Sequence, residues 1–345
     1  MRYSLLSRFR GTLVAAALGE ELGTYSRLEQ AFQQSSTPET GQCLPSAPSG
    51  LTHWHPGRPT NLKRPPLAPW GKAAVKCART LVQTGRWNEL EMAAIGTRLA
   101  TDKLVTGERL TRSRPQDAFS AAECAIATLP LALFFHDHER KQQQALRQTL
   151  QLWQSPPDSE AGLLVIGYAI AQGLSERLNP LTLMAQTMAY LQQSIANPTD
   201  TQLDLMLQLE QTEALVQQGA GLYTAIEQLR TKSTHAGNAA IALAFYCFLS
   251  TPENLRLSLL RAARCSEATS VVCALTGALS GCHNSFNGLP LAWRQESPLP
   301  LLWEVSNVEL SQLATHLFTV WSGSYTPNVA LPTSAIAAPG IIRPR

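Results

Sequence analysis

The sequence predicts an all-α protein. Apolar residues recur every three or four positions in one segment after another, which is the spacing of a helix face. The alternation with a period of two that marks strands is scarce. Hydrophobic residues make up 44% of the 345 residues, enough for a large buried core, whereas charged residues make up only 15%, below the roughly 25% of an average soluble chain.

The first predicted helix covers residues 5–23, where Leu5, Phe9 and Leu13 lie on one side and three alanines follow at Ala15 to Ala17. Further helices are expected at 73–83, 89–101, 118–135, 139–154, 160–174, 180–195, 201–218, 222–231, 236–249, 254–264 and 269–282. Helix-breaking residues separate them at Gly85, Pro115, Pro156-Pro157, Asn179-Pro180, Asn197-Pro198 and Thr251-Pro252.

Two segments do not fit the helical pattern. Residues 34–69 contain eight prolines among Ser, Thr and Gly, so we expect no helix there but either a functional loop or a poorly ordered one. The tail, residues 326–345, is rich in Pro, Ala and Thr and has no apolar face to bury. It is predicted to be disordered, with docking to a partner as an alternative role.

The helix expected at 269–282 carries a stripe of small residues. Ala274, Gly277, Ala278 and Gly281 have the spacing i, i+3, i+4 and i+7, which places them on one face. Such a face lets the backbone of another helix approach closely. The other face has valines and leucines, so the pattern predicts a central, tightly packed helix.

Charge and composition exclude several classes of function. With 28 Lys+Arg against 25 Asp+Glu the net charge is +3, which argues against a nucleic-acid binder with a dense basic face. No apolar run of about 18 residues predicts a membrane span. The start of the chain has no long apolar stretch before its next charge, so we expect no secretory signal and a cytoplasmic protein.

The seven cysteines are scattered and form no C-x-x-C pair. We expect them to be small buried side chains rather than a disulfide framework. They are Cys43, Cys77, Cys124, Cys247, Cys265, Cys273 and Cys282. Two H-x-H pairs, His53/His55 and His136/His138, are more typical of loops and surfaces than of metal sites, because each lacks further ligands nearby.

Several segments, in order along the chain, resemble the ADP-ribosylglycohydrolase family. Residues 275–281 (LTGALSG) and 288–293 (GLPLAW) are similar to the helix after the family's second acidic motif and to the connection that follows. Residues 8–13 (RFRGTL) and 17–23 (ALGEELG) resemble its opening motif. Residues 81–85 (LVQTG) and 242–249 (ALAFYCFL) resemble two further helices. The resemblance implies one helical domain, residues 1–325, with the Pro-rich insertion 34–69.

The resemblance also implies a chemistry that the motif residues do not support. The family is expected to hold two Mg²⁺ or Mn²⁺ ions between two acidic motifs and to cleave a glycosidic bond to ADP-ribose. Such hard cations need oxygen ligands, chiefly carboxylates. The first motif, Thr-Asp-Asp-Thr in the family, falls on residues 68–71 (APWG), followed by Lys72. A further family segment falls on 122–127 (AECAIA), which also lacks its pattern.

At the second motif the aspartates align with Glu267 and Thr269 and the last threonine with Ser270. Glu20 is the residue that best approximates an original acid. We therefore expect no metal ion and no cofactor, and treat Glu20 and Glu267 as vestigial catalytic positions. The alternatives are a capping role for Glu267 at a helix start and a solvated or salt-bridged helix end for Glu20.

The charge around the former metal site has changed sign. No acid occurs between Glu39 and Glu89, whereas basic residues are frequent there and in a second cluster. These are Arg58, Lys63, Arg64 and Lys72, then Arg109, Arg112 and Arg114. They suit phosphate or an acidic protein surface, although a solvated basic loop would have the same composition. Trp54 and Trp70 suit stacking, or a loop folded over the core.

We therefore predict a catalytically inactive relative that acts as a binding or regulatory module. Its partner is expected to be an acidic protein, or a nucleotide-like anion in the former metal cleft. The candidate cleft residues are Trp70, Lys72, Arg109, Arg112, Thr269 and Ser270. The alternatives are a metal-dependent hydrolase of ADP-ribosyl groups that uses substitute ligands, and a structural subunit.

Overall fold

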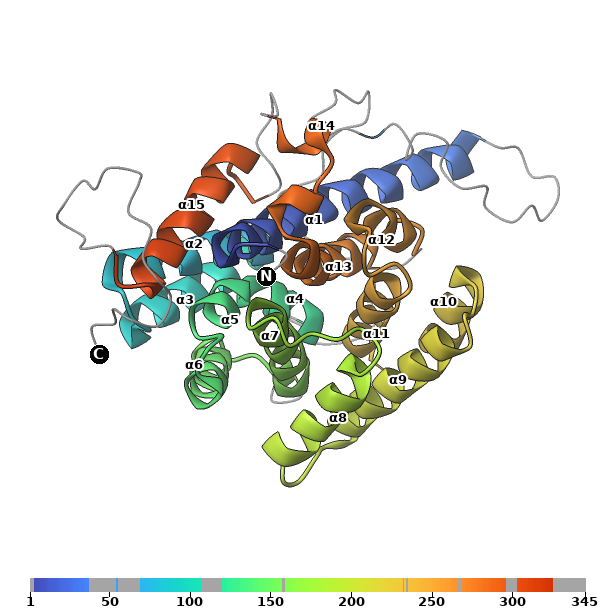
Figure 1. Ribbon diagram of the computed structural model, residues 1–345, viewed down its shortest axis with the longest axis horizontal. Helices are drawn as coiled ribbons and strands as arrows, with labels where there is room; N and C mark the ends of the chain where they lie inside the picture. Colours follow the sequence, from blue (N-terminus) through green and yellow to red (C-terminus); the bar gives the residue numbers. More distant parts are fainter. Residues whose placement is uncertain are drawn as a thin grey trace.

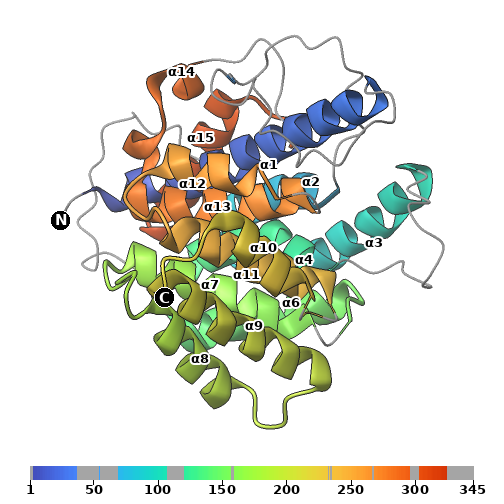
Figure 2. The same ribbon diagram turned by 90° about the vertical axis from the view of Figure 1, so that its right-hand side faces the viewer.

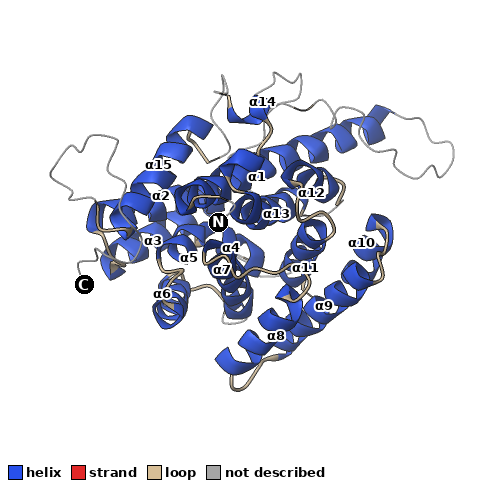
Figure 3. Cartoon of the chain, viewed as in Figure 1, coloured by secondary structure: helices blue, strands red, loops and turns tan. Residues whose placement is uncertain are grey.

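The computed structural model describes residues 3–36, 54, 69–106, 120–156, 159–231, 233, 235–265, 268–295 and 303–324. This part of the chain consists of helices and connecting loops and contains no strand (Figure 3), so the all-α prediction is confirmed. None of its helices combines the length and the apolar character needed to cross a membrane.

Fifteen α-helices and one short 3₁₀ helix are found in the described residues. They are α1 (Leu5–Ser36), α2 (Pro69–Thr84), α3 (Glu89–Thr106), α4 (Ala121–Ala127), α5 (Leu129–Phe134), α6 (Glu139–Leu152), α7 (Glu160–Leu174), α8 (Leu183–Ser194), α9 (Asp200–Gln217), α10 (Leu222–Thr231), α11 (Ala236–Leu249), α12 (Leu255–Ala262), α13 (Thr269–Asn284), η3 (Phe286–Gly288), α14 (Leu291–Arg294) and α15 (Asn307–Trp321).

Helices α1 and α13 form the centre of the molecule and run antiparallel. Gly277 of α13 lies against Ala15 of α1, and the first residue of α13, Thr269, lies against Gly23. A Cβ added at Gly277 would lie 2.7 Å from the carbonyl carbon of Ala15, so only glycine permits this crossing. The small-residue stripe predicted from the sequence is therefore a helix-packing face, and α1 is its partner.

The remaining helices surround this central pair. Helix α15 packs on α1 and α2, while α11 and α12 pack on α13, and α4 and α7 contact α13 from another side. Figures 1 and 2 show α8 and α9 together along the lower edge, farther from α1 than α11 and α12 are. Nearly every residue of α13 is buried, as the sequence predicted for a central helix.

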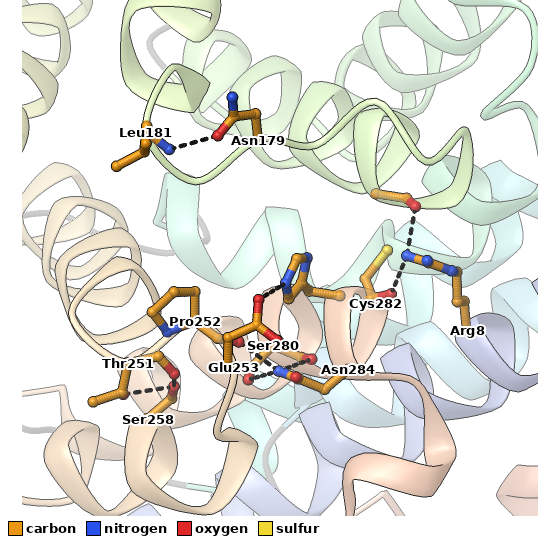
Figure 4. Close-up of polar contacts among 12 residues, drawn as sticks. Arg8, Asn179, Leu181, Thr251, Pro252, Glu253, Ser258, Ser280, Cys282 and Asn284 are labelled. Atoms are coloured by element: carbon orange, nitrogen blue, oxygen red, sulfur yellow. Dashed lines mark hydrogen bonds and ion pairs between the residues drawn. The ribbon is translucent and has the colours of Figure 1, made fainter. Parts of the chain in front are cut away.

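The C-terminal end of α13 is held by buried polar contacts (Figure 4). Arg8 of α1 donates hydrogen bonds to the carbonyls of Gly173 at 2.9 Å and Cys282 at 3.3 Å, so one guanidinium satisfies the open ends of α7 and α13. Asn284 donates to the Pro252 carbonyl at 2.7 Å and to Ser280. These contacts are at the C-terminal end of α13; its N-terminal end, at Thr269, lies at the motif positions.

Several predicted element boundaries were wrong. Helix α1 does not end at residue 23 but continues to Ser36, because Gly23 is a close-packing position rather than a stop. The segment 118–135 forms two helices, since Pro130 lacks a backbone N–H and Thr128 ends the first. Residues 34–36 and Pro69 are helical, contrary to the loop prediction, and Pro69 begins α2, a position that tolerates proline.

Other predictions have mixed outcomes. Helix α15 was not predicted, although its capping box of Ser306 and Glu309 is a recognisable start signal. The six cysteines other than Cys43 are buried free thiols in the structure, as predicted. Cys43 and the tail 326–345 lie outside the described residues.

Candidate functional site

The central feature of the motif region is a buried carboxylate. Glu20, in the middle of α1, is 0% exposed, so it is not the solvated helix end that the sequence suggested. Its Oε2 accepts hydrogen bonds from the indole N–H of Trp70 at 3.0 Å and from that of Trp303 at 2.7 Å. In the described part of the chain no partner reaches its other oxygen, Oε1.

The two indoles come from elements that are far apart in the sequence. Trp70 is the second residue of α2 and falls on the family's first acidic motif, whereas Trp303 precedes α15 and is 1% exposed. Trp303 lies directly against the backbone of Gly71, where an added Cβ would be 2.7 Å from the indole Cγ. The space beside the first-motif position is thus occupied by an aromatic side chain of the same chain.

Lys72 and Glu304 close the outer side of this group. Their Nζ and Oε1 atoms are 2.9 Å apart, with side-chain exposures of 20% and 49%. Both residues directly follow residues of the buried group in the sequence: Lys72 follows Gly71, and Glu304 follows Trp303. The ammonium group that we expected beside the first-motif position is therefore paired with a carboxylate.

Burial raises the pKa of the Glu20 carboxyl from 4.5 to about 7. Desolvation is the largest cause, because the charged form loses its hydration. The hydrogen bonds from Trp303 and Trp70 act in the opposite direction, and the charge of Glu123 adds a smaller upward effect. Around neutral pH, therefore, a large fraction of this carboxyl is protonated.

The other motif positions converge on the same part of α1. Thr269, at the start of α13, donates a hydrogen bond to the Cys265 carbonyl, and Ser270 is also buried; both lie against the Gly23 backbone, one turn from Glu20. Glu123 lies in the first turn of α4, where its Oε2 accepts from the Ser120 N–H at 2.8 Å, and its charge raises the Glu20 pKa slightly. Residues at motif positions of α1, α2, α4 and α13 thus lie near Glu20 or within a turn of it.

Some candidate residues cannot be placed. Glu267, Arg109 and Arg112 lie outside the described residues, as do Arg58, Lys63, Arg64 and Arg114. Trp54 is described and is buried; its carbonyl accepts from the Trp293 indole at 3.2 Å, so this side chain is part of the core rather than an exposed stacking platform.

Of the two histidine pairs, only His136/His138 lies in the described residues, and it is not part of a metal-binding group there. His136 is buried with Nδ1 at 2.7 Å from the Leu133 carbonyl, and His138 is near Asp137, while His53 and His55 are outside the described part. The described part of the chain contains no group of three His, Cys, Asp or Glu side chains that could hold a metal ion.

Sequence reasoning missed Trp303 and Glu304. No local motif marks Trp303, and its hydrogen-bond partner Glu20 is 283 positions away. It also missed a polar cluster at the start of α11, where Asn238 donates to Asp204 Oδ2 at 2.8 Å and Thr201 Oγ1 lies 3.1 Å from His235 Nε2. This cluster joins the N-termini of α9 and α11 and lies away from Glu20.

Comparisons with known proteins concern the family and the fold of the chain. The family model described as ADP-ribosylglycohydrolase matches residues 1–327. A solved structure titled "ADP-ribosylglycohydrolase-related protein complex" has a TM-score of 0.58 and 16% sequence identity; the match covers 91% of this chain and 99% of that one. At this identity the likeness shows the fold alone. No curated protein sequence matches this chain.

Proposed function

The chain belongs to the ADP-ribosylglycohydrolase family, and from this premise we propose that it acts by binding rather than by catalysis. The observation that carries the proposal is the enclosure of Glu20. The acid that best approximates an original motif carboxylate is 0% exposed and is covered by the indoles of Trp70 and Trp303. A carboxyl group enclosed in this way is shielded from solvent.

The residues around Glu20 do not fit the pair of hard cations that the family is expected to hold. Mg²⁺ and Mn²⁺ require several oxygen ligands, yet the groups aimed at Glu20 Oε2 are two N–H donors. Thr269 directs its hydroxyl hydrogen to the Cys265 carbonyl. We therefore propose a protein without a resident metal, and derive no catalytic step through one.

We predict that the protein does not hydrolyse ADP-ribosyl bonds in a metal-dependent way. Purified protein would be incubated with an ADP-ribosylated peptide and Mg²⁺ or Mn²⁺, next to an active family member. We expect no release of ADP-ribose above the buffer rate, and no Mn²⁺ binding by calorimetry. Metal-dependent release that is lost in both Glu20→Gln and Glu267→Gln would instead establish the hydrolase with substitute ligands.

Charge on α2 favours an acidic protein as the partner. Lys72, Lys76 and Arg79 have the spacing i, i+4 and i+7, which places them on one side of the helix, while the opposite side is buried. Lys72 is paired with Glu304, and Arg79 contributes to lowering the pKa of Glu309, after two larger effects of hydrogen bonds from Ser306. Because Trp70 and Thr269 are buried, this outer face is better placed to meet a partner than the former cleft is.

Reversing charges on α2 is expected to weaken binding to an acidic probe. A fluorescent poly-L-glutamate peptide would be titrated with wild type, with Lys76→Glu/Arg79→Glu, and with Arg140→Glu/Lys141→Glu, which makes the same net charge change on exposed positions of α6. We expect the α2 variant to lose affinity by about tenfold, since exposed ion pairs contribute ~1 kcal/mol or less each. Equal losses in both variants would show that only net charge matters and would contradict an α2 site.

A further inference from the structure

Trp303 is buried, but it is not part of a helix. It lies in a short turn before α15, and α15 begins independently at Asn307 with its own capping box, in which Ser306 and Glu309 satisfy each other's backbone N–H groups. The start of α15 is therefore stabilised by its own capping box and does not depend on the buried position of Trp303. Within the core, its indole lies against Gly71 and donates a hydrogen bond to Glu20.

The inserted position of Trp303 carries two local costs. Glu304 has a φ of 65°, a left-handed conformation that is strained for a residue with a Cβ. Glu20 Oε1 is buried, and the described residues give it no hydrogen-bond partner, which costs more than leaving the same atom in water. If Trp303 withdrew, the backbone at Glu304 could leave its left-handed conformation, and water could reach Glu20 Oε1.

The surface beneath Trp303 is shaped for a planar ring. Gly71 has no side chain, so the indole rests on the backbone of α2, with its Cγ 2.7 Å from the position a Cβ would take. Glu20 Oε2 accepts the Trp303 ring N–H at 2.7 Å, and Trp70 donates its own ring N–H to the same oxygen at 3.0 Å. Planar shape and a ring N–H are the two properties that this surface selects.

We infer that the Trp303 side chain occupies a binding site for a planar heteroaromatic molecule with a ring N–H donor, and that it can leave this site. The site is made by Glu20, Trp70 and Gly71. In the structure Trp303 fills it, with the Lys72–Glu304 pair closing the outside. A ligand of this class would bind only when Trp303 withdraws, and would hold it out.

The first test measures how Trp303 opens in the wild-type protein. Hydrogen exchange of the indole N–H groups would be followed by NMR on ¹⁵N-tryptophan-labelled protein, with Trp153 and Trp293 as internal controls. Both controls are buried and donate to backbone carbonyls, of Met92 at 2.9 Å and Trp54 at 3.2 Å. If Trp303 leaves its site by a local opening, its indole N–H should exchange at least about tenfold faster than that of either control. Low concentrations of denaturant should not change this exchange rate. Exchange at the same rate as Trp153, with the same denaturant dependence, would show an ordinary core residue.

A variant and a pair of probes test the site itself. In Gly71→Ala the new Cβ overlaps the indole, so Trp303 exchange should rise by a further tenfold or so while Trp153 exchange is unchanged. In wild type, excess indole should speed Trp303 exchange because it competes for the site, whereas 1-methylindole, which lacks the N–H, should not. Failure of Gly71→Ala to change Trp303 exchange, or equal effects of the two probes, would overturn the proposal.

Discussion

Replacement of Gly277 by leucine is expected to prevent the protein from folding. Gly277 lies where α13 crosses α1, and a Cβ there would be 2.7 Å from the Ala15 carbonyl carbon. The obstacle is backbone rather than a flexible side chain, so it can be relieved only by moving two central helices apart. Overpacking of a core commonly costs about 1–3 kcal/mol, and more where the neighbours cannot move, against a total stability of roughly 5–15 kcal/mol.

The measurement is urea unfolding followed by circular dichroism, with Gly277→Ala as the smaller step. We expect Gly277→Ala to lose about 3 kcal/mol and Gly277→Leu to be recovered only in aggregated or unfolded form. Gly221→Ala serves as the control, because a Cβ at Gly221 meets no atom within 4 Å. A Gly277→Leu protein with wild-type stability would mean that the close crossing of α1 and α13 is wrong.

This helix crossing also shows how far sequence reasoning extends. The stripe at Gly277 and Gly281 could be predicted because its period matches a helix face. Its partner could not, because no local pattern connects the stripe with α1, whose glycines Gly19 and Gly23 were noted only as part of the stretch that resembles the family's opening motif. In the structure Gly23 is inside α1 and lies against Thr269. The sequence alone does not distinguish a glycine that ends a helix from one that permits close packing.

The candidate site was predictable to a similar, partial extent. Resemblance to the family's motifs pointed to Glu20 and Trp70 and indicated that the acidic positions had changed. It did not indicate that Trp70 donates to Glu20, since no periodic pattern connects α1 with the start of α2. Trp303 was missed altogether because its contacts are all tertiary. Local patterns identify helices and their faces, whereas the pairing of Glu20 with two indoles depends on how α1, α2 and the turn before α15 are brought together.

The buried Glu20 carboxyl should make the protein less stable as the pH rises. Its pKa is about 7 in the folded protein and 4.5 in the unfolded chain. Below pH 4.5 both states hold the proton. Between pH 4.5 and about 7 the unfolded chain releases its proton while the folded protein retains it, so rising pH favours unfolding. At 1.4 kcal/mol per pKa unit, this group lowers the free energy of unfolding by about 3 kcal/mol across that window.

Glu20→Gln isolates this contribution, because a neutral amide of the same shape cannot lose a proton. Its oxygen can still accept from Trp70 and Trp303, so the two indoles should stay in place. We therefore expect the variant to lack the Glu20 part of the pH dependence, and its free energy of unfolding to gain about 3 kcal/mol on that of wild type between pH 4.5 and pH 8.

Urea unfolding at both pH values gives this double difference, in which the cost of the substitution itself cancels. Glu210→Gln, at an exposed position on α9, should follow wild type at both pH values. If instead the stability of Glu20→Gln parallels that of wild type from pH 4.5 to 8, Glu20 is ionised or hydrated in the folded protein, and its enclosure by Trp70 and Trp303 would have to be abandoned.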